Sequence, residues 1–249
     1  MTCNRIYNAA VTANQVRGWA KLQHDIVTCA RCPRLRTHCQ AVAAQKRAAF
    51  RDWDYWGKPL PNLGEPSARL LVVGLAPAAH GGNRTGRMFT GDRSGDFLFR
   101  AMYEAGFANQ PSSDHKDDGL QLIDAAITGV AHCAPPGNKP ALDELSNCSD
   151  FLDRTVDLMP DLRGVLALGR IAFDACLRLY RTRSWLPRDV RRRPVFAHGV
   201  VHRFPAAPFL AASFHPSQQN TFTGRLTPEM MRAVFDVARR LIDGARQSR

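Results

Sequence analysis

The chain has 249 residues, of which 45% are hydrophobic, and this is enough for one large α/β domain but short for two. Its 34 lysines and arginines outnumber its 22 aspartates and glutamates, which gives a formal net charge of +12. Such a charge favours polyanionic partners, although an arginine-rich surface that only keeps the chain soluble would look the same. We find no window of about 18 uncharged apolar residues and no signal-peptide pattern, so we expect a cytoplasmic protein that spans no membrane.

Short apolar runs alternate along the chain with segments of helical periodicity. The apolar runs predict buried strands at residues 69–74, 125–130, 164–169 and 209–213, and the periodic segments predict helices at residues 14–25, 94–105, 142–158, 170–181 and 228–243. Strands that are buried on both faces and separated by helices form parallel sheets covered on two sides. We therefore predict an α/β fold, a three-layer αβα sandwich with a central four-stranded parallel sheet, as a single domain over residues 1–249.

Three other features complete the predicted organisation. Ser94 and the sequence Thr227-Pro228-Glu229 have the residue types that begin helices. Residues 40–68, which include WDYWGKPLPNLGEP, are interpreted as an irregular lead-in rather than a linker between domains. Residues 181–204 carry a basic run and then an alternating stretch that can pair as a short hairpin.

Ligands of parallel sheets bind at the carboxyl ends of the strands, so the loops after the first, second and fourth predicted strands are expected to face one crevice. The first of these loops, GLAPAAHGGNRTGRMFTGDRSG at residues 74–95, contains neither of the common glycine-rich nucleotide motifs. Its glycines let a ligand approach the main chain closely. Phe89 precedes Asp92 in it, and a flat ring beside a carboxylate suits a planar base with an acid–base group. The alternative is a surface loop without a ligand.

The other two loops carry polar side chains of their own. The loop after the second strand, CAPPGNKP, holds Asn138 among prolines, and the loop after the fourth, SFHPSQQN, holds His215 directly before a proline. Proline fixes the backbone direction, which suits an imidazole that must point at a substrate atom. A structural histidine is the alternative. Together the three loops predict that a carboxylate, an amide, an imidazole and an aromatic ring surround one ligand.

Seven cysteines in such a chain indicate metal ligands, catalytic thiols or buried apolar residues before disulfides. Four of them form a C-x2-C pair and a second, wider pair: Cys29 and Cys32, Cys133 and Cys148. Four thiolates suit either a tetrahedral zinc ion or an iron–sulfur cluster, and the spacing does not choose between them. Cys39 is a further local candidate, whereas Cys176, in the apolar sequence IAFDACLRL, is expected in the core.

The pieces CARCPRL, GLAPAAHGGNRTGRMFTGDRSGDFL, AHCAPPGNKP and SFHPSQQNTFTGRLT resemble the uracil-DNA glycosylases of family 5, in the iron–sulfur branch of that superfamily. The resemblance extends over about residues 26 to 240, and the glycine-rich piece is its most specific part. It implies a four-stranded parallel sheet between helices and a [4Fe–4S] cluster rather than zinc. It also implies a DNA repair enzyme that hydrolyses the N-glycosidic bond of uracil, and of hypoxanthine and xanthine, in DNA and leaves an abasic site.

The resemblance assigns roles to individual residues. The cluster ligands would be Cys29, Cys32, Cys133 and Cys148, which leaves Cys39 free. The catalytic residues would be Asp92, Asn138 and His215. The base would bind at Gly74, Ala76, Phe89 and Gly129, with the flipped base stacked on Phe89. Leu75 and Gly129 stand where family 4 has a polar residue and an asparagine, which implies a larger, less strict pocket.

Contacts to the DNA backbone are expected from seven further residues: Arg84, Arg87, Ser217, Asn220, Arg191, Arg192 and Arg193. For the last three, which are consecutive, a solvated run of charge is the alternative. We expect a monomer without an obligate protein partner, associated with the nucleoid if the chain is bacterial.

A base inside a duplex is inaccessible, so the expected mechanism begins with rotation of the nucleotide out of the helix. His215 would then stabilise negative charge on the leaving base, and Asp92 would support the sugar cation and direct a water that Asn138 orients. The cluster would be structural. A non-catalytic zinc-stabilised DNA-binding module is the leading rival, and it gives Asp92 no role. A nucleotide hydrolase is disfavoured because no lysine lies between residues 59 and 115.

Overall fold

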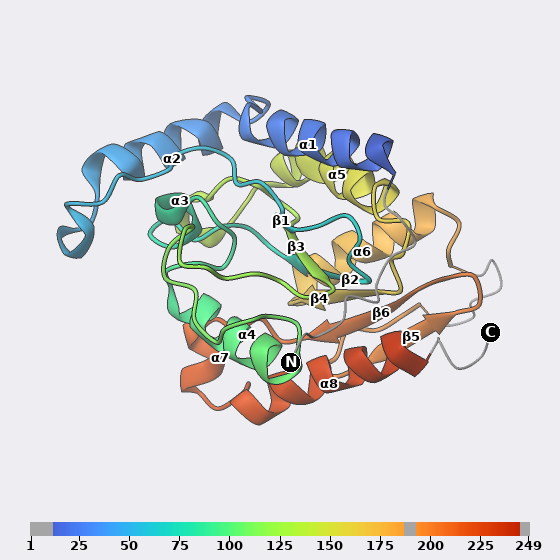
Figure 1. The fold of residues 1–249 in the computed structure, drawn as a ribbon. Coiled ribbons are helices and arrows are strands. Elements are labelled where there is room, and N and C mark those ends of the chain that lie inside the picture. Colours follow the sequence, from blue (N-terminus) through green and yellow to red (C-terminus); the bar gives the residue numbers. More distant parts are fainter. Residues whose placement is uncertain (1–11, 187–192, 245–249) are drawn as a thin grey trace.

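The fold is given by a computed structural model that describes residues 12–186 and 193–244 (Figure 1). Its strands form one sheet with the order β1-β3-β2-β4-β6-β5. The strands are β1 (Leu63–Gly64), β2 (Leu70–Gly74), β3 (Ala125–Gly129), β4 (Gly164–Leu168), β5 (Val201–Phe204) and β6 (Ala207–Ser213). β3, β2, β4 and β6 pair in parallel at the centre, and they are the four strands that the apolar runs predicted.

The sheet differs from the prediction at both edges. In the part of the chain that the structure describes, it has six strands rather than four, because β1 pairs antiparallel with β3 and β5 pairs antiparallel with β6. β1 is too short to produce a sequence pattern, and it depends on Gly64, where φ is 97° and a side chain would lie 2.6 Å from the carbonyl oxygen of Ala125. The alternating stretch predicted a hairpin within residues 181–204, but only β5 comes from that stretch, and it pairs with β6, which the sequence predicted as a separate strand at residues 209–213.

The helices are α1 (Ala13–Val27), α2 (Pro33–Gln45), α3 (Gly82–Thr85), α4 (Arg93–Glu104), α5 (Leu142–Asp157), α6 (Arg170–Thr182), α7 (Gln218–Phe222) and α8 (Pro228–Gly244), with short 3-10 turns at η1 (Ala48–Phe50) and η2 (Pro136–Asn138). The five predicted helices correspond to α1, α4, α5, α6 and α8. α2, α3 and α7 were not predicted. α2 begins at Pro33, a residue type that suits the first helical position, and it occupies the first part of the segment predicted as irregular.

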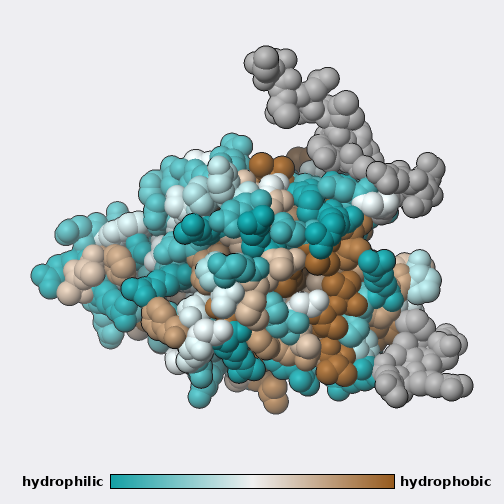
Figure 2. Space-filling view, turned by 90° about the horizontal axis from the view of Figure 1, so that it is seen from below, coloured by the Kyte–Doolittle hydropathy of each residue, from teal (hydrophilic) through white to brown (hydrophobic). Residues whose placement is uncertain are grey.

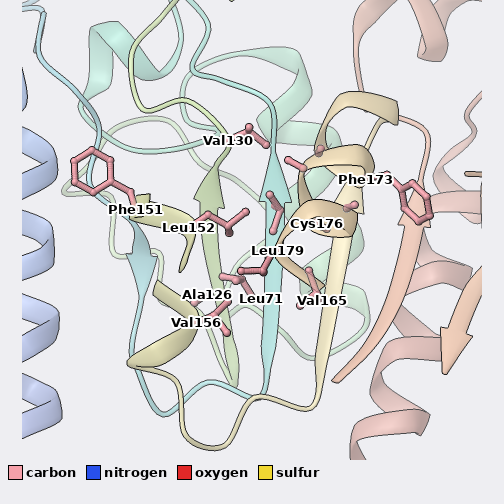
Figure 3. Close-up of a cluster of buried hydrophobic side chains, with 14 of the residues drawn as sticks. Leu71, Ala126, Val130, Phe151, Leu152, Val156, Val165, Phe173, Cys176 and Leu179 are labelled. Carbon is pink, nitrogen blue, oxygen red and sulfur yellow. The ribbon is translucent and has the colours of Figure 1, made fainter. Parts of the chain in front are cut away.

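Helices cover both faces of the sheet, which confirms the three-layer αβα arrangement (Figure 1). α5 and α6 pack on one face, and α1 packs with them. Figure 3 shows strand residues such as Leu71 and Val165 with Leu152 of α5 and Leu179 of α6 in one buried cluster. Cys176 is fully buried in this cluster, as its apolar context predicted. Each fully buried leucine or phenylalanine contributes about 2 kcal/mol of hydrophobic free energy.

α4 and α8 cover the opposite face. Phe99 and Met102 of α4 pack with Phe235 of α8 against the other side of the strands. Figure 2 shows the molecule from this side, where most of the surface is hydrophilic and a hydrophobic strip crosses part of it. Among the residues that the structure describes, no helix is both long enough and apolar enough to cross a membrane.

Two helix starts bear on the site. α4 begins after Asp92, whose Oδ1 accepts a hydrogen bond from the backbone N–H of Gly95 at 3.0 Å, so Asp92 and not Ser94 is the N-cap. α8 begins at Pro228 after Thr227, as predicted, and the hydroxyl of Thr227 accepts from the N–H of Met230 at 3.2 Å. The acid expected to be catalytic therefore also ends a loop and starts a helix.

Candidate active site

A cavity of about 510 Å³ opens at the carboxyl ends of the parallel strands. The three loops predicted to face one crevice all contribute to its wall. Seven predicted catalytic and base-binding residues line it: Gly74, Ala76, Phe89, Asp92, Gly129, Asn138 and His215. Its volume is in the range of sites that enclose small organic ligands. The parallel pairing of the strands brings these residues together, although they are far apart in the sequence.

Phe89 forms one wall of the cavity in an uncommon backbone conformation. Its φ is 51°, a left-handed value that bulky residues rarely adopt. Two glycines make room for it. A side chain at Gly74 would lie 2.8 Å from the Phe89 ring, and one at Gly95 would lie 1.8 Å from the Phe89 carbonyl oxygen. Such a strained position is characteristic of a functional site.

A buried polar network holds the turn that carries Phe89. Arg87 donates to both carboxylate oxygens of Asp118, at 2.8 and 2.6 Å, and to the hydroxyl of Ser113 at 2.9 Å. Ser113 in turn shares a 2.7 Å hydrogen bond with Thr90. Arg87 is only 6% exposed, so its guanidinium supports the loop from inside and presents no surface to a phosphate. The expectation that Arg87 contacts DNA therefore does not fit the structure.

Asp92 lies against main chain on both sides. Its Oδ1 caps α4. A Cβ atom at Gly81 would lie 2.0 Å from the Oδ2 of Asp92, so only glycine fits at position 81. Burial raises the pKa of Asp92 above its usual value, and hydrogen bonds from the backbone of Gly95 and Ser94 oppose that effect. A carboxylate with a raised pKa at a cavity wall has the properties of an acid–base group.

Arg84 supports the same loop from the other side. It is 3% exposed, and it donates from Nε to the carbonyl of His80 at 2.8 Å and from Nη2 to the carbonyl of Gly91 at 2.7 Å. Gly91 has a φ of 74°, and a side chain there would lie 2.4 Å from Nη2. The charge of Arg84 also lowers the pKa of Asp92. Arg84 is thus a buried brace behind Asp92 rather than an exposed phosphate contact.

His215 and Asn138 complete the wall. The imidazole of His215 lies 6.0 Å from the Phe89 ring between centroids, with 33° between the planes. Burial lowers the pKa of His215 to about 4, so the ring is neutral at pH 7. Asn138 is exposed at the cavity rim, with a left-handed φ of 58°. Within the described residues, neither side chain makes a hydrogen bond to the protein, which leaves both for a ligand or water.

Thr128 is a wall residue that the sequence analysis missed. It is 0% exposed, lines the cavity, and its hydroxyl has no hydrogen-bond partner within the described chain. A polar residue inside the apolar run AAITGV is the signal that would have indicated it. Its neighbour Gly129 has little room for a side chain, since a Cβ would lie 2.6 Å from the carbonyl oxygen of Ala131.

The five remaining candidates for DNA contact differ in where they lie. Ser217 lines the cavity and caps α7 by accepting from the N–H of Asn220 at 3.4 Å. The amide of Asn220 donates to the carbonyl of His215 at 2.8 Å, so it holds the histidine loop. Arg193 lies 3.6 Å from Asp174, in an exposed ion pair. Arg191 and Arg192 lie outside the described residues.

Cysteines gather between α2, the loop after β3, and α5. Cys32, Cys39 and Cys133 are buried in one small cluster with Leu35 and Ala134. The thiol of Cys39 donates to the carbonyl of Ala134 at 3.5 Å. This thiol is also close enough to Cys133 to raise the pKa of Cys133, together with burial. Cys39, to which the resemblance gives no ligand role, is thus a buried neighbour of the predicted ligand Cys133.

The other predicted ligands are close by. Burial raises the pKa of the Cys148 thiol to about 11, and the thiols of Cys32 and Cys29 add to this effect. The amide of Asn147 donates to Cys32 Sγ at 3.6 Å. No group of three or more His, Cys, Asp or Glu side chains within residues 12–186 and 193–244 has the spacing of a formed metal site.

The donor set nevertheless fits a metal centre. Cysteine thiolates are the ligands of iron–sulfur clusters and of structural zinc. Buried thiols with raised pKa values stay protonated without a nearby cation, and a bound metal favours the thiolate form. The residues therefore fit the group that the family resemblance implies.

Comparison with known proteins agrees with this geometry. The family model of the uracil DNA glycosylase superfamily matches residues 61–239. The type-5 uracil-DNA glycosylase of Mycobacterium leprae (strain TN) is 47% identical over 222 residues, which are 89% of this chain and 94% of that protein. The type-5 enzyme of Thermus thermophilus is 44% identical over 216 residues, 87% of this chain and 94% of its own. A type-4 enzyme of Sulfurisphaera tokodaii is 28% identical over 152 residues, 60% of this chain and 54% of its own.

An αβα sandwich with this cavity at its strand ends, matched over most of its length, is a member of the uracil DNA glycosylase superfamily. Within the superfamily, the chain belongs to the type-5 uracil-DNA glycosylases. The family resemblance of the four sequence pieces is therefore confirmed. The rival hypothesis of a non-catalytic zinc-stabilised module finds no support in these comparisons.

Proposed function

We propose that this chain, a uracil-DNA glycosylase by family, hydrolyses the N-glycosidic bond in the cavity at the carboxyl ends of its parallel strands. The observation that carries the proposal is that Phe89, Asp92 and His215, from two distant loops, line this single cavity. A base enters it only after the nucleotide has rotated out of the duplex, at a cost of a few kcal/mol. The base then lies against the ring of Phe89, and the left-handed backbone there holds that ring in place.

The reaction breaks the bond between the sugar C1′ and the base nitrogen, and a water oxygen forms a new bond to C1′. Positive charge develops on the sugar and negative charge on the base. The carboxylate of Asp92 stabilises the sugar and accepts a proton from the attacking water, which the Asn138 amide orients. The neutral imidazole of His215 donates a hydrogen bond to the base, so the leaving group departs as an anion. Thr128 offers a further hydroxyl to the base edge.

Four cysteines are proposed to hold a [4Fe–4S] cluster: Cys29, Cys32, Cys133 and Cys148. When bound, such a cluster supplies a structural cross-link and no open coordination position for the reaction, because every iron has its cysteine ligand. Cys133 follows β3 and Cys148 lies on α5, while Cys29 and Cys32 directly precede α2. The cross-link would therefore fix the two N-terminal helices to the loop that carries Asn138.

The finer points of the function rest on the chain's charge and its expected surroundings. The formal net charge of +12 favours DNA as the polyanionic partner. We infer a cytoplasmic enzyme that acts as a monomer beside the nucleoid. Removal of hypoxanthine and xanthine stays a prediction. A single-turnover cleavage assay with oligonucleotides that contain those bases tests it.

Substitution of Asp92 with Asn tests the mechanism. Asn caps helices as well as Asp does, so the substitution preserves α4 but removes the carboxylate that would accept the proton of the attacking water. We expect the single-turnover rate on a duplex with uracil opposite guanine to fall by about 10²–10³-fold, with the melting temperature little changed. Asp236→Asn, on the surface of α8, is the matched control. A D92N rate within about threefold of the wild-type rate would mean that Asp92 only caps the helix.

A further inference from the structure

A second cavity, of about 720 Å³, adjoins the base cavity and has no role in the mechanism above. The two cavities share five wall residues: Ala78, Asp92, Arg93, Asn138 and Gln218. A strand of DNA whose base occupies the first cavity has its next residue within reach of the second, because successive nucleotides are covalently joined. The shared wall makes the two spaces neighbouring subsites on one path.

The outer wall of the second cavity comes from the segment predicted as an irregular lead-in. Phe50 and Trp53 line it, with ring centroids 6.3 Å apart and 78° between the planes. The guanidinium of Arg84 lies over both rings, 3.8 Å from the centroid of Phe50 and 4.0 Å from that of Trp53. Such cation–π contacts fix the rings in place. Aromatic side chains held in this way are the stacking surfaces that single-stranded nucleic acid uses.

The segment is tied to the site by its backbone. The N–H of Trp56 donates to the carbonyl of Arg84 at 3.0 Å, and the N–H of Gly57 donates to that of Asn83 at 3.1 Å. The hydroxyl of Tyr55 shares a hydrogen bond with His80 at 3.1 Å. The aromatic wall is therefore a fixed part of the glycine-rich loop's surroundings.

The polar groups of the cavity match a nucleotide. Arg47 and Arg93 are exposed on its wall and can meet a phosphate. Arg84 Nη1 is buried and has no hydrogen-bond partner within the described residues. Asp96 and Asp114 face the same space, where carboxylates accept hydrogen bonds from the exocyclic amino groups of bases. Cations and acids on one wall suit a ligand that has both a phosphate and an amino-bearing base.

We propose that this second cavity binds the nucleotide next to the flipped one on the same strand, with its base against Phe50 and Trp53 and its phosphate toward Arg47 and Arg93. The proposal rests on the proposed function, since it names a subsite for the same substrate. Removal of the neighbouring base from the DNA and removal of the Trp53 ring from the protein should then abolish the same stacking interaction.

A thermodynamic cycle tests this. The substrates are duplexes with uracil opposite guanine, in which the nucleotide on the 5′ side, the 3′ side or neither side of uracil is a tetrahydrofuran abasic residue. On the intact duplex, Trp53→Ala should lower kcat/KM about tenfold, mostly through KM, and Trp53→Phe should restore most of it. On the duplex that lacks the bound neighbour, the effect of Trp53→Ala should shrink to less than about twofold.

Controls separate the possible failures. Tyr103→Ala removes an exposed ring at the far end of α4 and should leave every substrate unaffected. Arg47→Ala should raise KM without changing kcat. The slope of log KM against log salt concentration should fall by about the amount expected for one lost phosphate contact. An equal effect of Trp53→Ala on all three duplexes, or no effect on any, overturns the subsite. A wild-type enzyme that leaves uracil in place on the intact duplex overturns the proposed function instead.

Discussion

The base cavity and the cysteine cluster both lie beyond the carboxyl end of β3, yet they are organised differently. In the cavity, Phe89 and Asp92 are held by buried hydrogen bonds and by glycines that leave no space for other positions. Among the cysteines, Cys32 and Cys133 are neighbours in one small buried cluster, and a bound metal would complete their ligand set. Packing alone can preorganise a site made of protein groups, whereas a metal site is completed by its ion.

This contrast predicts that loss of metal affects stability and that loss of cavity groups affects rate. The largest effect should come from Cys148→Ala. Without one ligand, the cluster should not assemble, so the visible absorbance expected of an iron–sulfur cluster is lost and the free energy of unfolding falls by about 2–5 kcal/mol, as when a native covalent cross-link is removed. Visible absorbance and chemical denaturation measure the two quantities. Cys176→Ala, in the buried face of α6, should keep the visible absorbance, and so should Cys39→Ala. A stable, active and colourless C148A protein would contradict the structural role.

His215→Ala should have the next largest effect, and it should act on rate alone. Loss of one donor to a developing anion lowers kcat by about 10²–10³-fold, while the melting temperature stays near that of the wild type. Because the pKa of His215 is about 4, its charge does not change between pH 6 and pH 8, and the wild-type rate should show no step from this group there. Single-turnover kinetics across that range, with the exposed His24→Ala as control, measure both points. A sharp rise in rate near pH 6.5 that H215A abolishes would contradict the neutral form.

Arg84→Gln should have a smaller effect, with a direction set by pH. Asp92 acts as a carboxylate, burial raises its pKa, and the charge of Arg84 lowers it. Without that charge the pKa rises further, so activity is lost at a higher pH as the solution is acidified. Arg93 and Asp96 on α4 and His215 across the cavity are unchanged by the substitution.

We expect the R84Q single-turnover rate to fall below the wild-type rate by a factor that is larger at low pH than at pH 8, measured as the pH profile of that rate. Arg100→Gln, in an exposed pair on α4, is the control. An R84Q profile parallel to that of the wild type would show that Arg84 acts only on stability.

Much of the fold could be predicted from the sequence because its signals are local. The four parallel strands are apolar runs, and five helices have a clear period. β1 could not be predicted, since its pairing depends on Gly64 meeting β3 rather than on a pattern of its own. α4 begins one residue earlier than the sequence predicts, and its N-cap is Asp92 rather than Ser94, because both residue types suit that position and only the fold shows which one meets the backbone N–H of Gly95.

The composition of the site was predictable, but the environment of its charges was not. Asp92, Asn138 and His215 come together because parallel strands end at one edge of the sheet. Arg84 and Arg87 were expected on the surface because arginine is usually exposed. Their burial depends on partners that only the fold brings near: Arg87 pairs with Asp118, 31 residues along the chain, and Arg84 lies under two rings from the lead-in.

The edges of the sheet limit how copies of this chain can associate at high concentration. β1 offers two residues and β5 offers four, with a register shift within the β5–β6 pair. Short and irregular edges give a neighbouring chain little backbone to pair with. The sheet edges of the described residues are thus poor templates for edge-to-edge aggregation between copies of this chain.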